Sequence, residues 1–113
     1  MGKIMDNEIQ GLYVWLDDLR PMPEHYHIHC KTAKEAIDLL ATDNVNHISF
    51  DHDLGEPEEV VGNGYLVAKA IEEMAFNKTI RFVTWSIHSA NPVGRKNIEK
   101  AMESAERFWG IRQ

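Results

Sequence analysis

The hydrophobic pattern of the chain predicts short β-strands that alternate with helices. Four runs of apolar, β-branched and aromatic residues are each typical of a buried strand. They are expected at residues 12–17, 26–30, 47–51 and 80–87, and the last of them is the longest. The run at 26–30 alternates histidine with apolar residues, which is typical of an edge strand with one face in water.

Helices are expected between and after these strands, where apolar residues recur every three or four positions. The first begins at Thr32, which forms an S/T-x-x-E capping box with Glu35. The second follows a loop at 55–64 and continues to about Asn77, and the third has Asn91 as its expected N-cap, followed by proline. The supporting apolar positions are Ala33, Ala36, Ile37 and Leu40; Val67, Ala70, Ile71 and Met74; and Ile98, Ala101, Met102, Ala105 and Phe108.

This alternation predicts an α/β fold with a mainly parallel four-stranded sheet and helices on both faces. The connection from residue 18 to residue 26 contains two prolines and is too short for a helix. An extended chain covers about 3.3 Å per residue, so this segment just returns along a short strand. Residues 11–113 are expected to form one domain, and the polar residues 1–10 a flexible N-terminal segment.

Acidic residues follow the first and third predicted strands, in the sequences DD at 17–18 and DHD at 51–53. In a parallel sheet the ligand site lies beyond the carboxyl ends of the strands, so these groups are expected at one edge. Clustered carboxylates repel one another, and a hard divalent cation relieves that repulsion. Asp17, Asp18 and Asp51 are therefore predicted to hold Mg²⁺ or Mn²⁺, although Asp18 is also compatible with capping the next turn.

Two histidines and one further acid are candidates for proton transfer. His88 ends the fourth predicted strand, and His52 and Asp53 follow the third. An imidazole titrates near neutral pH, so both histidines are candidate catalytic acids or bases. The alternatives are that His88 is a structural histidine, that His52 points outward at the turn, and that Asp53 supports an Asx turn.

Three residues around the start of the last helix are candidates for binding a substrate phosphate. Arg95 lies one turn inside that helix and carries a planar guanidinium that suits a phosphate, and the N-terminus of a helix favours an anion. Ser89 and Asn91 can donate hydrogen bonds at the same place. The alternatives are a capping role for Asn91 and a solvated position for Arg95.

Composition and charge narrow the classes of partner and location. The chain has 113 residues and a formal net charge of -6, which is unfavourable for binding duplex DNA but compatible with a small phosphate-containing molecule or an RNA end held through a cation. Cys30 is the only cysteine, so no internal disulfide forms and a reducing compartment is expected. No apolar run is long enough to cross a membrane, and no signal-peptide pattern is present. A cytoplasmic protein is expected.

The motifs WLDDLRPMP, FDHDLG and HSANPVGR resemble those of the cyclic-phosphate processing receiver domain family, a derived relative of response-regulator receiver domains. The resemblance covers about residues 12–108. It implies a flavodoxin-like three-layer sandwich in which Asp17 and Asp18 match the acidic pair that helps to bind Mg²⁺. It also matches Asp51 to the phosphoryl-accepting aspartate, and it places Ser89 near the hydroxyl residue that follows the fourth strand.

The chain departs from the ordinary receiver pattern in two places. A proline loop replaces the first helix, and the fifth strand with its phosphoryl-contacting lysine is not found in the sequence. Without that lysine a phosphorylation switch is not expected, and the additional residues His52, Asp53, His88 and Arg95 fit an enzyme better. The resemblance implies a metal-dependent phosphoesterase acting on cyclic phosphates such as RNA ends with a 2′,3′-cyclic phosphate or cyclic nucleotides. The alternative is a non-catalytic receiver-like module that binds a protein partner or senses a nucleotide.

Overall fold

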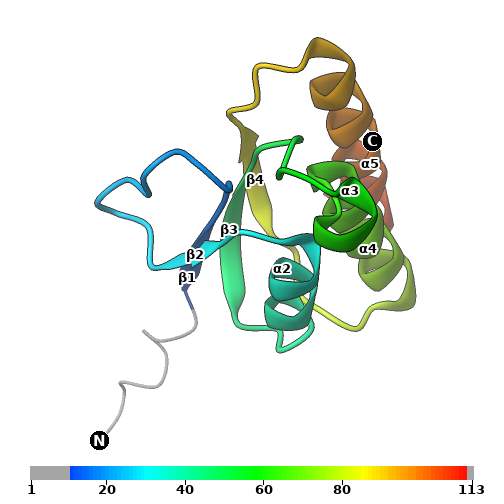
Figure 1. Ribbon diagram of the computed structural model, residues 1–113. Helices are drawn as coiled ribbons and strands as arrows, with labels where there is room; N and C mark the ends of the chain where they lie inside the picture. Colours follow the sequence, from blue (N-terminus) through cyan, green and yellow to red (C-terminus); the bar gives the residue numbers. More distant parts are fainter. Residues whose placement is uncertain (1–10, 112–113) are drawn as a thin grey trace, which may run out of the picture.

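A four-stranded sheet forms the centre of the molecule (Figure 1). The computed structural model describes residues 11–111. The strands are β1 (Leu12–Leu16), β2 (Ile28–Cys30), β3 (Val45–Phe50) and β4 (Thr84–Ile87). Their order is β2-β1-β3-β4, and each neighbouring pair is parallel. The predicted α/β fold of receiver type, with a parallel four-stranded sheet, is confirmed.

Four helices are described, named α2 (Ala33–Leu40), α3 (Glu58–Val61), α4 (Gly64–Asn77) and α5 (Pro92–Trp109). The predicted helices correspond to α2, α4 and α5, whereas the short α3 lies in a segment predicted to be loop. It was missed because four residues carry too little periodicity to be distinguished from a turn.

Side chains cap the three longer helices at their first turns. Thr32 Oγ1 accepts a hydrogen bond from the Glu35 backbone N–H at 3.2 Å, as the capping box predicts. The Glu35 carboxylate does not complete the box in the usual way, because it accepts from the Lys31 backbone N–H. Asn63 and Asn91 cap α4 and α5 through their side-chain oxygens.

The helices pack against one face of the sheet, where the hydrophobic core lies (Figure 1). On this face, β1 and β3 each contribute alternate residues that are almost fully buried: Val14, Leu16, Ile48 and Phe50. They pack in one cluster with buried residues of α2, α4 and α5. The alternation follows from the period of two along a strand.

The opposite face of the sheet carries a loop instead of a helix. Residues 18–27 connect β1 to the parallel β2, as the short connection predicts. Trp15 Nε1 donates a hydrogen bond to the Arg20 carbonyl at 3.2 Å, and the Tyr26 ring packs edge-on against the Trp15 ring. The third layer that was expected to be helical is therefore a loop with aromatic contacts over Trp15.

The strand boundaries differ from the predicted ones. The fourth strand begins at Thr84 rather than residue 80, so it is shorter than β3. The preceding backbone bonds elsewhere, because the Ile80 carbonyl accepts from Trp109 Nε1 and the Arg81 N–H donates to Asp43 Oδ1. These partners lie about thirty or more positions away along the chain, so the local pattern of β-prone residues does not reveal them. The second strand begins two residues later than predicted, and the third begins two earlier and ends one earlier.

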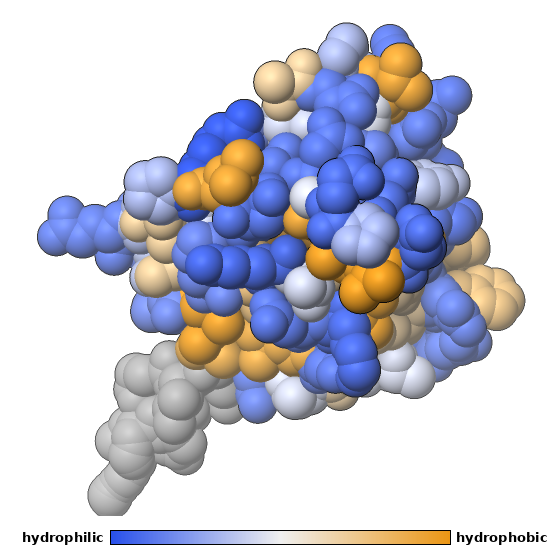
Figure 2. Space-filling model, viewed as in Figure 1, coloured by the Kyte–Doolittle hydropathy of each residue, from blue (hydrophilic) through white to orange (hydrophobic). Residues whose placement is uncertain are grey.

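The surface is mostly hydrophilic on the face seen in Figure 2, and apolar side chains occur there in separate patches. Within residues 11–111, no helix has the combination of length and apolar composition needed to cross a membrane. The predicted flexible segment 1–10 lies outside the described residues.

Candidate metal and phosphate site

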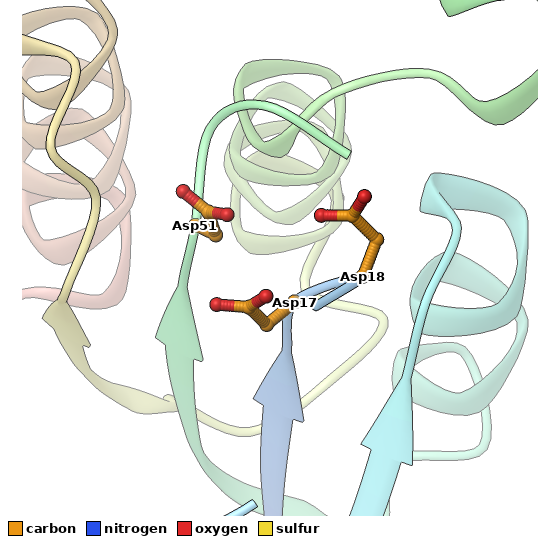
Figure 3. Close-up of side chains that lie close together, drawn as sticks. All are labelled: Asp17, Asp18 and Asp51. Atoms are coloured by element: carbon orange, nitrogen blue, oxygen red, sulfur yellow. The ribbon is translucent and has the colours of Figure 1, made fainter. Parts of the chain in front are cut away.

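Three carboxylates meet at the carboxyl ends of β1 and β3 (Figure 3). Asp17 and Asp18 follow the last residue of β1, and Asp51 follows the last residue of β3. One oxygen of each lies within 4.8 Å of those of the other two. The predicted juxtaposition of these residues is therefore present.

Asp17 is the buried centre of this cluster, with no exposed surface. Its Oδ1 accepts hydrogen bonds from the backbone N–H groups of Leu19 and Arg20, both at 2.8 Å. Its Oδ2 faces Arg20 Nη1 and His88 Nε2, both at 2.9 Å. Burial disfavours the ionised carboxyl, but these donors outweigh it and lower the pKa of Asp17 to about 2. Asp17 is therefore ionised at neutral pH.

Asp51 and Asp18 differ in how far their charge is compensated. Asp51 Oδ1 accepts from the His52 backbone N–H at 2.8 Å, and Oδ2 accepts from Arg20 Nη1 at 3.2 Å. The half-buried Asp18 carboxylate has no hydrogen-bond partner within residues 11–111. Gly55 lies beside it with a φ of +105°, and a Cβ there would lie 3.1 Å from Asp18 Oδ2. Arg20 thus contacts Asp17 and Asp51 but not Asp18, and one guanidinium beside three carboxylates leaves net negative charge.

A cavity of about 400 Å³ lies above the cluster and opens to solvent. Asp18, Arg20, Asp51 and Asp53 supply its polar and charged lining. Its size is within the range of small-molecule sites, about 300–1,000 Å³. Oxygen ligands and uncompensated negative charge are the features that hard divalent cations require.

His88 contacts Asp17 outside the cavity lining, and both of its ring nitrogens are engaged. Nε2 is 2.9 Å from Asp17 Oδ2, and Nδ1 is 2.8 Å from Ser49 Oγ. The ring stacks on Trp15 with a centroid separation of 3.8 Å. Ionised Asp17 is an acceptor only, so Nε2 carries the proton and Nδ1 accepts from the Ser49 hydroxyl. Burial lowers the pKa of His88 despite the opposing effect of Asp17, which favours this neutral tautomer.

His52, Asp53 and Asn91 form a second cluster, of which Asp53 alone lines the cavity. His52 Nδ1 is 2.9 Å from Asp53 Oδ1, and this contact is the main cause of the lowered pKa of Asp53. Asn91 Nδ2 lies 3.4 Å from both Asp53 oxygens, while its Oδ1 caps α5 by accepting from the Gly94 N–H. A Cβ at Gly94 would lie 2.3 Å from His52 Cγ, so the absence of a side chain there lets the imidazole pack against α5.

Arg95 and Ser89 hold the loop that leads into α5. Arg95 Nη1 donates to the carbonyls of Ile87 and Ser89, at 3.0 and 3.3 Å. Ser89 is buried, and its Oγ accepts from the Asn91 backbone N–H at 3.1 Å. Neither residue lines the cavity. The predicted phosphate-binding role of these two residues stays a prediction, and their contacts tie them to the backbone of the loop.

Sequence reasoning missed the side chains that support the acidic cluster. Arg20 was passed over although it stands three positions after Asp17 in the sequence DDLR. Ser49 and Ser86 were also missed, and the Ser86 hydroxyl donates to Ser49 Oγ at 2.9 Å. The available signal was register: Ser49 lies two positions before Asp51, so it faces the same side of the sheet.

Comparison with known proteins gives a family match. The family model described as the cyclic-phosphate processing receiver domain matches residues 12–104, which is most of the chain. No curated protein and no solved structure matches the chain. The matched span contains the acidic cluster, Arg20, both histidines of the site and the start of α5. The chain belongs to the family of cyclic-phosphate processing receiver domains.

Proposed function

We propose that the protein is a phosphoesterase that opens cyclic phosphates with the help of a divalent cation. Substrates of this class include RNA ends with a 2′,3′-cyclic phosphate and cyclic nucleotides. The observation that supports the proposal best is the carboxylate cluster of Asp17, Asp18 and Asp51 under an open cavity. Among the described residues 11–111, Arg20 is the only arginine or lysine in contact with these carboxylates, and it contacts two of the three, so the cluster keeps net negative charge.

The donor set fits Mg²⁺ or Mn²⁺, which prefer carboxylate oxygens. Asp18 and Asp51 line the cavity, and Asp17 lies below them. These three residues would hold the cation. When bound, it would polarise a phosphate and lower the pKa of a bound water.

Asp53 in the cavity lining and the adjacent His52 are the candidate groups for proton transfer. Opening a cyclic phosphodiester requires removal of a proton from the attacking water and delivery of a proton to the leaving alkoxide. We assign these transfers to His52, oriented by Asp53, because the carboxylate fixes the proton on Nδ1 and leaves Nε2 of the neutral ring as the base. His88 has no free ring nitrogen, so we assign it to positioning Asp17. General acid–base help of this kind contributes about 10²–10⁴-fold in rate.

The test is phosphorus NMR of the protein incubated with a 2′,3′-cyclic nucleotide or a cyclic dinucleotide in Mn²⁺. We expect one of the two substrate classes to be converted to a phosphomonoester or linear product. The conversion should be lost in Asp51→Asn and retained in the matched control Asp38→Asn, which changes an exposed acid on α2. Turnover that is unaffected by Asp51→Asn, or no conversion of either class, would contradict the proposal.

A second candidate is a receiver-like module that does not hydrolyse its ligand. The observation that favours it is Asp51, which is 6% exposed, follows β3 and contacts a cation, Arg20. A buried aspartate beside a cation is a suitable acceptor for a phosphoryl group. Incubation with acetyl phosphate and Mg²⁺ followed by intact mass measurement tests this. A phosphorylated product in wild type but not in Asp51→Asn, without cleavage of a cyclic phosphate, would support the receiver-like module. The function would then be binding of a protein partner.

A further inference from the structure

We infer that Arg20 is both the resident counter-ion of the acidic cluster and its phosphate-binding side chain. In the cation-free protein its guanidinium bridges Asp17 and Asp51. When a divalent cation binds, the guanidinium leaves these carboxylates and binds the phosphate in the cavity. The inference rests on the metal site of the proposed function and assigns a role to a residue outside the predicted site.

The contacts of Arg20 connect two segments that lie far apart in the chain. Nη1 is 2.9 Å from Asp17 Oδ2 and 3.2 Å from Asp51 Oδ2. Both carboxylate side chains are almost fully buried, whereas the Arg20 side chain is 46% exposed. The guanidinium therefore contacts the buried carboxylates while the Arg20 side chain reaches the solvent, and Arg20 lines the same cavity as Asp51.

Competition with a cation follows from the partners of the individual oxygens. The Oδ1 atoms of Asp17 and Asp51 accept hydrogen bonds from backbone N–H groups. Their Oδ2 atoms are the ones that contact Arg20. A cation that binds these Oδ2 atoms from the cavity meets the positive guanidinium at the same place. The two cations repel each other, so binding of one weakens the contacts of the other.

The cavity offers Arg20 a second position. It is the only basic residue among the cavity-lining residues of the described chain, while the Asp18, Asp51 and Asp53 carboxylates repel an anion. A guanidinium binds two phosphate oxygens at once through its planar fork. Arg95, the cation that the sequence suggested for this role, donates to two backbone carbonyls instead.

Only the side chain of Arg20 has to move, because its backbone is fixed. The Arg20 N–H donates to Asp17 Oδ1, and the Arg20 carbonyl accepts from Trp15 Nε1. These bonds anchor the residue at the start of the loop that replaces a helix on this face. The exposed part of the side chain is free to rotate toward the cavity on the time scale of side-chain motion, ps–ns for exposed residues.

The inference predicts two affinity changes of opposite sign in Arg20→Gln. By calorimetry, Mn²⁺ should bind about tenfold more tightly than to wild type, because one positive charge that repels the cation near the carboxylates is gone. In saturating Mn²⁺, inorganic phosphate should bind about tenfold more weakly, because the fork is lost. Arg107→Gln, at the exposed end of α5, removes the same charge far from the site and should change neither affinity.

Arg20→Lys separates charge from geometry and covers the case in which Arg20→Gln does not fold. It should bind Mn²⁺ as wild type does and phosphate about tenfold more weakly, because an ammonium lacks the planar fork. Circular dichroism melting identifies a folding defect. Mn²⁺ binding that is unchanged or weaker in folded Arg20→Gln overturns the inference while leaving the metal site intact, as does wild-type phosphate binding in Arg20→Lys. No Mn²⁺ binding by any variant overturns both.

Discussion

The two faces of the sheet are built from the same strands but from different chemistry. The face under α2, α4 and α5 presents aliphatic residues and Phe50 to one hydrophobic core. The other face presents Trp15, His88 and hydroxyl groups of β3 and β4, linked by stacking and hydrogen bonds. Buried polar groups are stable only when they are hydrogen-bonded, and on this face Ser49 and His88 are hydrogen-bonded to each other and, through His88, to Asp17.

The difference between the faces shows how the site is supported. A helix over the second face would cover it with side chains, whereas the loop at 18–27 brings Arg20 and Tyr26 to it. The hydrogen bonds run from Ser86 through Ser49 and His88 to Asp17. We interpret the helical face as the main source of stability and the loop-covered face as the support that fixes the carboxylates.

The largest expected effect is on the helical face. Phe50→Ala should lower the free energy of unfolding by about 3–5 kcal/mol, because Phe50 is fully buried and the change leaves a cavity. Thr84→Ala, at an exposed position of β4 on the other face, should cost about 1 kcal/mol or less. Urea unfolding monitored by circular dichroism measures both. Equal costs would remove the distinction between the faces.

Low pH should lower the free energy of unfolding, because it protonates Asp17 on the loop-covered face. Its pKa falls from 3.8 to about 2 on folding, so the unfolded chain binds more protons at low pH. The resulting stabilisation, about 2 kcal/mol at 1.36 kcal/mol per unit, is complete above about pH 4 and is lost as the pH falls through about 2. Urea unfolding of the metal-free protein between pH 5 and 2, roughly the range set by these two values, measures it. Asp17→Asn should show a shallower dependence on pH; an identical slope would contradict this assignment.

Removing one hydroxyl tests the support of His88. Ser49→Ala leaves the half-buried Nδ1 of His88 without its donor, so we expect a loss of about 1 kcal/mol in unfolding free energy. Ser86→Ala removes the next hydroxyl, which is exposed, and should cost less. Denaturant titration of both variants gives the comparison. A larger loss of unfolding free energy in Ser86→Ala than in Ser49→Ala would contradict the assignment, because it would mean that the hydrogen bond from Ser49 to His88 is not the main contribution of these hydroxyls.

The smallest expected effect is on the reactivity of Cys30, whose thiol is buried on the helical face. Cys30 is 3% exposed, and burial together with the nearby Glu35 raises the pKa of its thiol to about 11. Because the thiolate is the reactive form, an aromatic disulfide reagent at pH 8 should react about a hundredfold more slowly than with the unfolded chain. The absorbance of the released thiolate follows the reaction, with protein in urea as the control. Equal rates would show that β2 opens readily.

Local signals predicted the helix starts and the acidic cluster well. Thr32 and Asn91 cap helices as expected because capping depends on residues three positions away. Asp17 and Asp51 meet because parallel strands end at one edge. The start of β4 was wrong because the backbone of residues 80–83 finds partners in distant segments.

The sequence by itself determined the alternation of strands and helices and the edge at which the carboxylates gather, since hydrophobic period and strand direction are properties of neighbouring residues. Only the tertiary structure decided which cation meets those carboxylates, which nitrogen of His88 carries its proton and which loop covers Trp15. Those outcomes depend on contacts between residues as far apart as Asp17 and His88, whose separation in space is set by packing of the whole sheet.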